Sequence, residues 1–271
     1  MTKNRNRRKK GRRTSRATRG VWGPVVLWLV LAAVAIACSH RIVPTELVPP
    51  GRVLGGLEIP ALGERDTVIY NEEGRYTFLY RPACKVSQWV AYKLTRSDVA
   101  GEAGRSDAFA PDPRLERYGW VSATHADYRG SGYDRGHLLP SADRTDSEVA
   151  NRATFLYSNM APQLPKLNRG AWKLLEERLR RLTAEYDTLY VVVGTVVDDR
   201  HGQTIGDGVA VPELFFKAVA LRRADVFDEE AYVMPNDGER LAGHTFSDFA
   251  VSLDSVERLT GLDLFPDIPL F

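Results

Sequence analysis

A short polar segment, residues 130–144, concentrates the side chains that could do chemistry. It reads Gly-Ser-Gly-Tyr-Asp-Arg-Gly-His-Leu-Leu-Pro-Ser-Ala-Asp-Arg. His137 is suited to act as a general base, because the ordinary pKa of imidazole is about 6.5. Arg135 and Arg144 have the fixed charge and forked donors that suit phosphate oxygens. The alternative interpretation is a polar turn in which the acid and the histidine are only hydrogen-bonded.

Oxygen-bearing side chains follow this segment at intervals, namely Asn159, Gln163, Asn168 and Glu176. Amide and carboxylate oxygens are hard ligands of the kind that Mg²⁺ prefers. This ion usually keeps several of its waters, so one protein oxygen with a few water-ordering neighbours can form a site. The residue types therefore indicate a histidine that works beside a hydrated divalent ion.

Together these residues form a pattern that is far more specific than its parts. Residues 131–137 are followed by Ser158-Asn159-x-x-Pro162-Gln163, then Asn168-x-x-x-Trp172 and Glu176. The pattern resembles the DNA/RNA non-specific endonucleases, which include sugar non-specific bacterial nucleases and mitochondrial endonuclease G. The resemblance runs from about Trp89 to Leu264. An Asp-Arg-Gly-His tetrapeptide alone would be weak evidence for this family, but its spacing to the later residues makes the evidence strong.

The resemblance implies a role for each matching residue around the metal. His137 would activate the attacking water, and Asn168 would bind a single Mg²⁺ through its side-chain oxygen, with Mn²⁺ as the other possible ion. Glu176 would hold one of the metal-bound waters. Eight residues of ideal helix separate Asn168 and Glu176 by about 12 Å, too far for both to bind one ion. The role of Glu176 therefore requires a water or an irregular helix start near Gly170, and the alternative is a solvated helix face with Arg180 at i+4.

The resemblance also assigns the groups that meet the phosphate. Arg105 aligns with the family's upstream arginine, which stabilises charge in the transition state. Arg96 is the other candidate for that role. The alternative interpretation of Arg105 is a solvated charge in a loop. Arg135 joins this set from within the tetrapeptide. Asn159 would help to position the phosphate or the histidine. DNA and RNA are the implied substrates.

The elements that must position these residues are strands and helices without a βαβ rhythm, which predicts an α+β fold. The resemblance implies a ββα-metal (His-Me finger) core with a mixed, largely antiparallel sheet flanked by helices. Leu189 to Val193 indicates a strand covered on both faces. Apolar residues that recur at spacings of three and four predict a helix over 171–186. Further predicted elements are strands at 67–70, 76–80, 88–94 and 231–235, a strand pair around Pro212, and a helix over 246–259 with Thr245 or Ser247 as N-cap and Gly261 as its end.

The N-terminus predicts export. Residues 1–20 contain ten Lys or Arg and no acid, and residues 21–38 are uncharged and almost wholly apolar. Such a segment is close to the shortest that can span a bilayer. It predicts an exported, membrane-associated protein whose catalytic domain is extracytoplasmic, either as a lipoprotein attached through Cys38 or through an uncleaved signal anchor. We expect residues 39–65 to be a linker and residues 66–271 the endonuclease domain.

Charge outside that segment limits the kind of binding. The residues after Cys38 have a net charge of −8, so positive charge must be gathered locally for phosphate binding. We expect a weak, non-specific grip on nucleic acid, with Arg129 and Arg144 among its contributors. Two other functions stay open at this point: a nucleic-acid-binding or scaffold protein that has lost catalysis, and a membrane-associated phosphodiesterase for smaller substrates.

Overall fold

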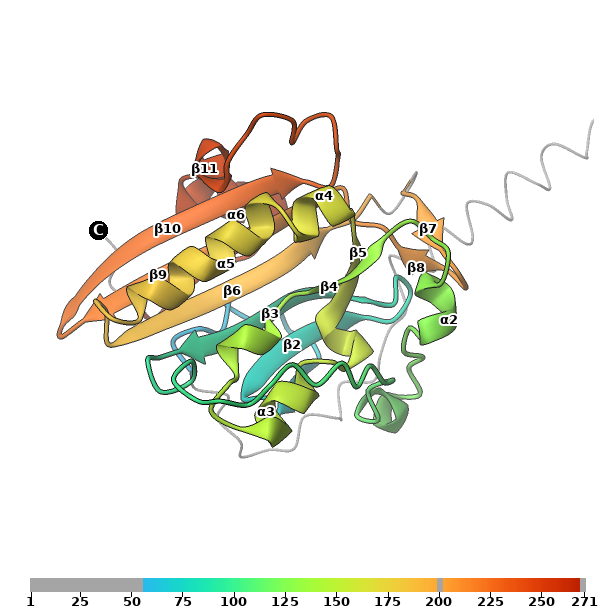
Figure 1. The fold of residues 1–271 in the computed structure, drawn as a ribbon, viewed down its shortest axis with the longest axis horizontal. Coiled ribbons are helices and arrows are strands. Elements are labelled where there is room, and N and C mark those ends of the chain that lie inside the picture. Colours follow the sequence, from blue (N-terminus) through green and yellow to red (C-terminus); the bar gives the residue numbers. More distant parts are fainter. Residues whose placement is uncertain (1–55, 199–201, 269–271) are drawn as a thin grey trace, which may run out of the picture. The chain divides into compact units, whose positions relative to one another are not determined.

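The centre of the protein is a seven-stranded sheet in which every neighbouring pair is antiparallel (Figure 1). The computed structural model describes residues 56–198 and 202–268. This architecture confirms the predicted α+β class with a largely antiparallel sheet. In spatial order the strands are β1 (Val68–Asn71), β2 (Tyr76–Arg81), β3 (Val86–Leu94), β6 (Thr188–Val196), β9 (Leu214–Arg223), β10 (Val226–Pro235) and β11 (Ala250–Val251).

Strand β6 lies in the middle of the sheet and is buried on both faces. Val191 and Val193 contact one hydrophobic core, whereas Val192 contacts the other. Because successive side chains of a strand point to opposite faces, an unbroken apolar run needs cover on both. The prediction for this run is confirmed. The predicted strand pair around Pro212 consists of β8 (Val209–Ala210) and β9, but β8 pairs with β7 (Thr204–Ile205) in a small separate sheet.

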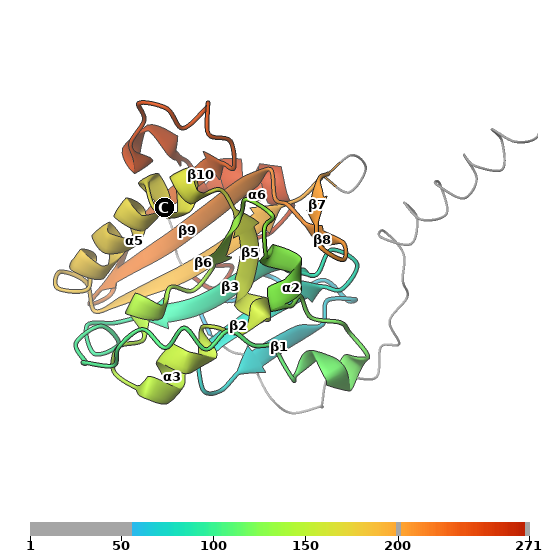
Figure 2. The same ribbon diagram turned by 45° about the vertical axis from the view of Figure 1, so that its right-hand side comes forward.

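Helices cover the two faces of the sheet (Figure 2). Helix α5 (Ala171–Leu182) buries Trp172, Leu175 and Leu179 against one face, which confirms the predicted stripe. It ends four residues earlier than predicted, since the Thr183 hydroxyl donates to the Arg180 carbonyl at 2.7 Å and the chain then turns. Helix α6 (Leu253–Thr260) covers the other face.

The prediction of a single helix over 246–259 is wrong. The segment divides into a short 3-10 turn η4 (Phe246–Phe249), strand β11 and helix α6. Two extended residues intervene because β11 pairs with β10, and Ser252 then caps α6 by accepting from the Ser255 amide. Val256 reaches the core as expected, but Leu259 is 40% exposed. Gly261 ends the helix at φ 72°, as predicted.

A second, two-stranded sheet carries the polar tetrapeptide. Strand β4 (Asp134–His137) is that tetrapeptide, and it pairs antiparallel with β5 (Met160–Gln163). Helices α4 (Pro165–Asn168) and α5 follow β5 directly, which gives a ββα unit. Gly136 is needed for the pairing, because a Cβ at that position would lie 2.6 Å from the Gln163 Cβ. The remaining elements are η1 (Leu115–Tyr118), α2 (His125–Tyr128), η2 (Ser141–Asp143), α3 (Glu148–Ala153) and η3 (Tyr157–Asn159).

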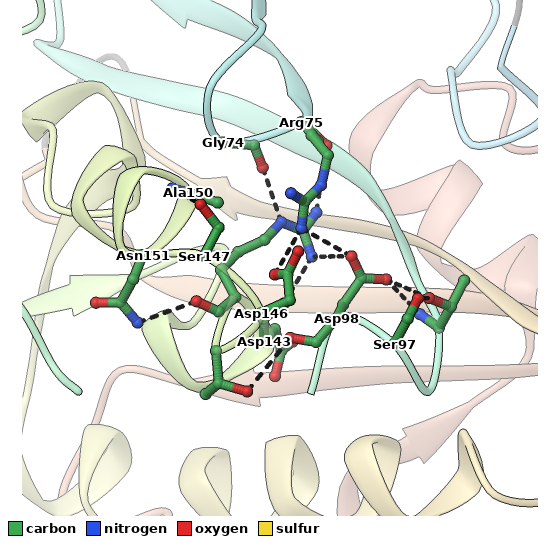
Figure 3. A network of polar contacts seen from close by, with 12 residues as sticks. Gly74, Arg75, Ser97, Asp98, Asp143, Asp146, Ser147, Ala150 and Asn151 are labelled. Carbon is green, nitrogen blue, oxygen red and sulfur yellow. Dashed lines mark hydrogen bonds and ion pairs between the residues drawn. The ribbon is translucent and has the colours of Figure 1, made fainter. Parts of the chain in front are cut away.

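A buried arginine, Arg144, ties the segment after β4 to the large sheet. Figure 3 shows the polar network around Arg75 and Asp98 to which it belongs. Arg144 is 1% exposed and donates to the carbonyls of Gly74, Asp143, Arg75 and Lys93 at 2.7–3.3 Å. The same network contains ion pairs from Arg75 to Asp98 and to Asp146. The prediction that Arg144 contributes to phosphate binding is therefore wrong. Its guanidinium is occupied by backbone oxygens, a partner set that the sequence did not reveal.

The predicted export segment and the start of the linker lie outside the described residues, so those assignments stay predictions. Residues 56–198 and 202–268 include no helix with the length and apolarity needed to cross a membrane. Cys84 is buried, as expected for a small apolar side chain.

Candidate active site

A cleft of about 340 Å³ lies beside strand β4. Four arginines and two aspartates line it, together with His125, Asn168 and three aromatic side chains. Among the residues predicted for the site, Arg105, Arg135 and Asn168 line this cleft. They come from the loop before η1, from β4 and from the end of α4, so the ββα unit and one loop bring them together.

His137 lies directly behind an aromatic side chain of the cleft lining. Its ring makes edge contacts with Phe109 and Phe155, at centroid distances of 6.0 and 4.8 Å. Burial, together with the nearby positive charges of Arg105 and Arg135, lowers the pKa of His137 to about 3, against a backbone hydrogen bond at Arg135 that raises it. The imidazole is therefore neutral at pH 7.

The hydrogen bonds of the ring determine which nitrogen can take a proton. Nε2 of His137 is buried and has no hydrogen-bond partner among the described residues. A backbone hydrogen bond at Arg135 raises the pKa of the ring without outweighing the other effects. A neutral imidazole has one nitrogen that carries hydrogen and one that carries a lone pair. Such a ring can accept a proton as a general base.

Asn168 is oriented by the acid of the tetrapeptide. Its Nδ2 donates to Asp134 Oδ2 at 2.9 Å. Asp134 also accepts from Arg169, through Nε at 2.9 Å and Nη2 at 2.6 Å. Since a carboxylate only accepts, the amide nitrogen must face Asp134 and Oδ1 must face away from it. Oδ1 has no hydrogen-bond partner in the described part of the chain.

This donor set fits a hydrated Mg²⁺. The carboxamide oxygen of Asn168 is a hard ligand in a cleft with exposed side chains, which leaves room for the waters that Mg²⁺ retains. Over residues 56–198 and 202–268 there is no group of three or more His, Cys, Asp or Glu side chains that could hold a metal. The assignment of the ion to Asn168 with several waters stays a prediction.

The two predicted arginines of the cleft each lie over one ring of an aromatic pair. The Arg105 guanidinium lies over the Phe155 ring at 4.9 Å, and its Nε pairs with Asp107 at 2.7 Å. The Arg135 guanidinium lies over the Phe109 ring at 3.7 Å. Both rings contact His137, so each cation lies over a ring that contacts the base.

Asn159 is fully buried and acts on the backbone. Its Oδ1 accepts from the Leu139 amide at 2.9 Å, and its Nδ2 donates to the carbonyls of Leu139 and Thr154, both at 2.8 Å. These bonds hold the chain two residues after His137. Of the two roles implied for Asn159, the geometry fits positioning of the histidine.

Glu176 does not line the cleft. It lies on α5 with its Oε1 3.8 Å from the Nζ of Lys217, which is fully buried on β9 and lies over the Trp172 ring at 4.7 Å. Burial raises the pKa of Glu176, and the Lys217 charge opposes that change. The implied role of Glu176 at a metal-bound water stays a prediction.

Three of these contacts were missed from the sequence. Phe109 covers the base, Lys217 pairs with Glu176, and Asp134 orients Asn168. Asp134 was visible within the tetrapeptide, yet its partner lies 34 residues further along the chain. Phe109 and Lys217 carry no local signal, because an isolated aromatic residue in a loop and a lysine in a strand are ordinary.

Comparisons with known proteins identify the family of the chain. A family profile described as DNA/RNA non-specific endonuclease matches residues 61–271. A nuclease from Nostoc sp. is 37% identical over 205 residues, which cover 72% of this chain and 73% of that protein. Mitochondrial endonuclease G of Homo sapiens is 38% identical over 205 residues, covering 71% and 68%. A crystal structure of an EndoG/EndoGI complex matches with a TM-score of 0.67 at 34% identity, covering 78% of this chain and 89% of the other. The chain belongs to the DNA/RNA non-specific endonuclease family.

Proposed function

We propose that this protein is a metal-dependent endonuclease that hydrolyses phosphodiester bonds in both DNA and RNA. The observation that carries the proposal is the neutral His137, whose Nε2 is buried and unpartnered among the described residues, beside an arginine-lined cleft that Asn168 also lines. Family membership supports the phosphodiester chemistry. Contacts to phosphate carry no sequence information, so the enzyme accepts either sugar and any base.

His137 Nε2 takes a proton from a water, whose oxygen attacks phosphorus in line as the bond to the 3′ oxygen breaks. Because Nε2 is buried, the aromatic side chains beside it must shift when substrate and water enter. Arg105 and Arg135 stabilise the charge that develops on the phosphate oxygens.

Asn168 would hold the divalent ion through Oδ1, with Asp134 fixing the direction of the carboxamide. When bound, Mg²⁺ supplies positive charge to the phosphate oxygens and to the departing 3′ oxygen. Mn²⁺ satisfies the same oxygen ligands.

The test uses the full chain in detergent, with plasmid DNA and RNA as substrates, first with Mg²⁺ and then with EDTA. We expect metal-dependent cutting of both. His137→Ala abolishes it without unfolding the protein, and Asn168→Ala loses the response to metal. His244→Ala is the matched control, since His244 is exposed and does not line the cleft. Unchanged rates in either site variant, or no cutting by the wild type, would contradict the proposal.

A further inference from the structure

The cleft has an uneven distribution of charge. Of its four arginines, Arg105 and Arg169 are paired with the two aspartates of the lining. Arg129 and Arg135 have no carboxylate partner in the described ranges. The uncompensated positive charge of the cleft therefore lies on the side where α2 and β4 meet.

His125, the first residue of α2, adds a donor on that side. It is exposed, and its Nδ1 lies 3.3 Å from the Arg135 Nη1. A guanidinium can only donate, so Nδ1 accepts and the hydrogen of the neutral ring is on Nε2. This Nε2–H has no partner among residues 56–198 and 202–268. His125 and Arg129 both line the cleft.

The turn that carries these two side chains is held from both sides. The Thr124 amide and hydroxyl donate to Asp127 Oδ2 at 2.7 and 2.8 Å, and the Asp207 amide donates to Asp127 Oδ1 at 2.7 Å. A Cβ on Gly206, where φ is +50°, would lie 2.3 Å from the Asp127 Cα. The backbone of α2 is thus fixed before any ligand arrives, which lowers the entropy cost of binding.

We propose that His125 and Arg129 form a second phosphate subsite, which binds the phosphodiester next to the one that is cleaved. The inference rests on the proposed function. Arg135 joins the two positions, since its guanidinium lies over Phe109, which contacts His137, while its Nη1 contacts His125. A single strand in the cleft has one phosphate at the Arg105 end and a neighbour at the His125 end. The ligand is sugar-phosphate backbone, without base readout.

Two measurements on the full chain test this subsite. The first is the preference for a single-stranded DNA of about 12 nucleotides over thymidine 5′-(p-nitrophenyl phosphate). The smaller substrate has one phosphodiester, so it has no neighbouring phosphodiester that could occupy the second subsite. The preference is the ratio of the two kcat/KM values. We expect Arg129→Ala to lower that ratio by about ten-fold, since a charge-assisted contact is lost only with the longer substrate. An unchanged ratio would overturn the subsite.

The second measurement is binding of the labelled oligonucleotide in EDTA, followed by fluorescence anisotropy at several salt concentrations. Arg129→Ala should make the plot of log affinity against log salt shallower by about 0.7, the value for one phosphate contact on a single strand. Arg129→Lys should keep the slope. His125→Ala should weaken binding, because the strand loses a hydrogen-bond donor.

Controls separate this inference from the proposed function. Arg181→Ala removes an exposed arginine outside the cleft and should leave both the ratio and the slope unchanged. If the wild type cleaves neither substrate, the proposed function fails, and the salt slope alone decides on the subsite. An Arg129→Ala slope equal to that of the wild type would refute the subsite even in an active enzyme.

Discussion

Replacing Asp134 with Asn should weaken metal binding without removing a metal ligand. Asp134 accepts one hydrogen bond from Asn168 and two from Arg169. Burial raises the pKa of Asp134, but the bonds from Arg169 and Asn168 outweigh it and hold that pKa below its ordinary value. The carboxylate is therefore ionised at neutral pH and can only accept.

The expected magnitude follows from the donors that remain. In Asp134→Asn the new side chain must turn its oxygen to Arg169, because a guanidinium only donates. Its NH₂ group then faces the Asn168 NH₂, and the Asn168 carboxamide must turn over to offer its oxygen instead. The oxygen that we assign to the metal would then face residue 134. Loss of such an orienting partner typically lowers metal affinity by about 10–100-fold, or about 1.4–2.8 kcal/mol.

The assay is Mn²⁺ binding without substrate, measured by electron paramagnetic resonance of the unbound ion, with a Mg²⁺ titration of the cleavage rate beside it. Arg169→Ala is the matched control. It removes the ion pair with Asp134 but keeps the bond from Asn168, and Arg169 is 72% exposed, so little stability is lost. We expect Mn²⁺ affinity close to that of the wild type in this control.

Two results would refute the reasoning about Asp134. One is wild-type Mn²⁺ affinity in a folded Asp134→Asn protein, which would mean that the direction of the Asn168 carboxamide does not matter. The other is an equal loss in Arg169→Ala, which would make the effect one of net charge in the cleft.

Three further predictions concern buried charge. His137 has a pKa of about 3 in the folded state and about 6.5 in the unfolded state. Between these pH values the unfolded state binds more protons than the folded state. The free energy of unfolding therefore falls as the pH drops below about 6.5, by up to about 1.4 kcal/mol per pH unit. Urea unfolding at several pH values checks this, and an equal pH slope in His137→Phe would contradict it. Arg144→Met should lower the free energy of unfolding by about 3 kcal/mol or more, since four backbone carbonyls lose their donor. A melting temperature near that of the wild type would disprove the role of the network. Lys217→Met should destabilise the protein by leaving the Glu176 carboxylate unpaired, and adding Glu176→Leu should restore stability. A wild-type cleavage rate in that double variant would show that Glu176 holds no metal-bound water.

Much of the fold was predictable because its signals are local. The valine run of β6 and the spaced apolar residues of α5 each carry their burial pattern within one segment. The predicted helix over 246–259 failed because pairing of β11 with β10 is a contact between distant segments. Its apolar residues fit a helical period, but a hydrogen-bonding partner elsewhere in the chain held two of them extended.

The sequence by itself determined which chemical groups the protein has: an imidazole, an amide oxygen and arginines, in an order typical of one family of nucleases. Only the tertiary structure decided which of them are available. It placed Arg105 and Arg135 over the two rings that contact His137, and it buried Arg144 among backbone carbonyls. The physical reason is that spacing along the chain sets residue type and local geometry. The availability of a charge or a lone pair depends instead on partners that folding brings from elsewhere in the chain.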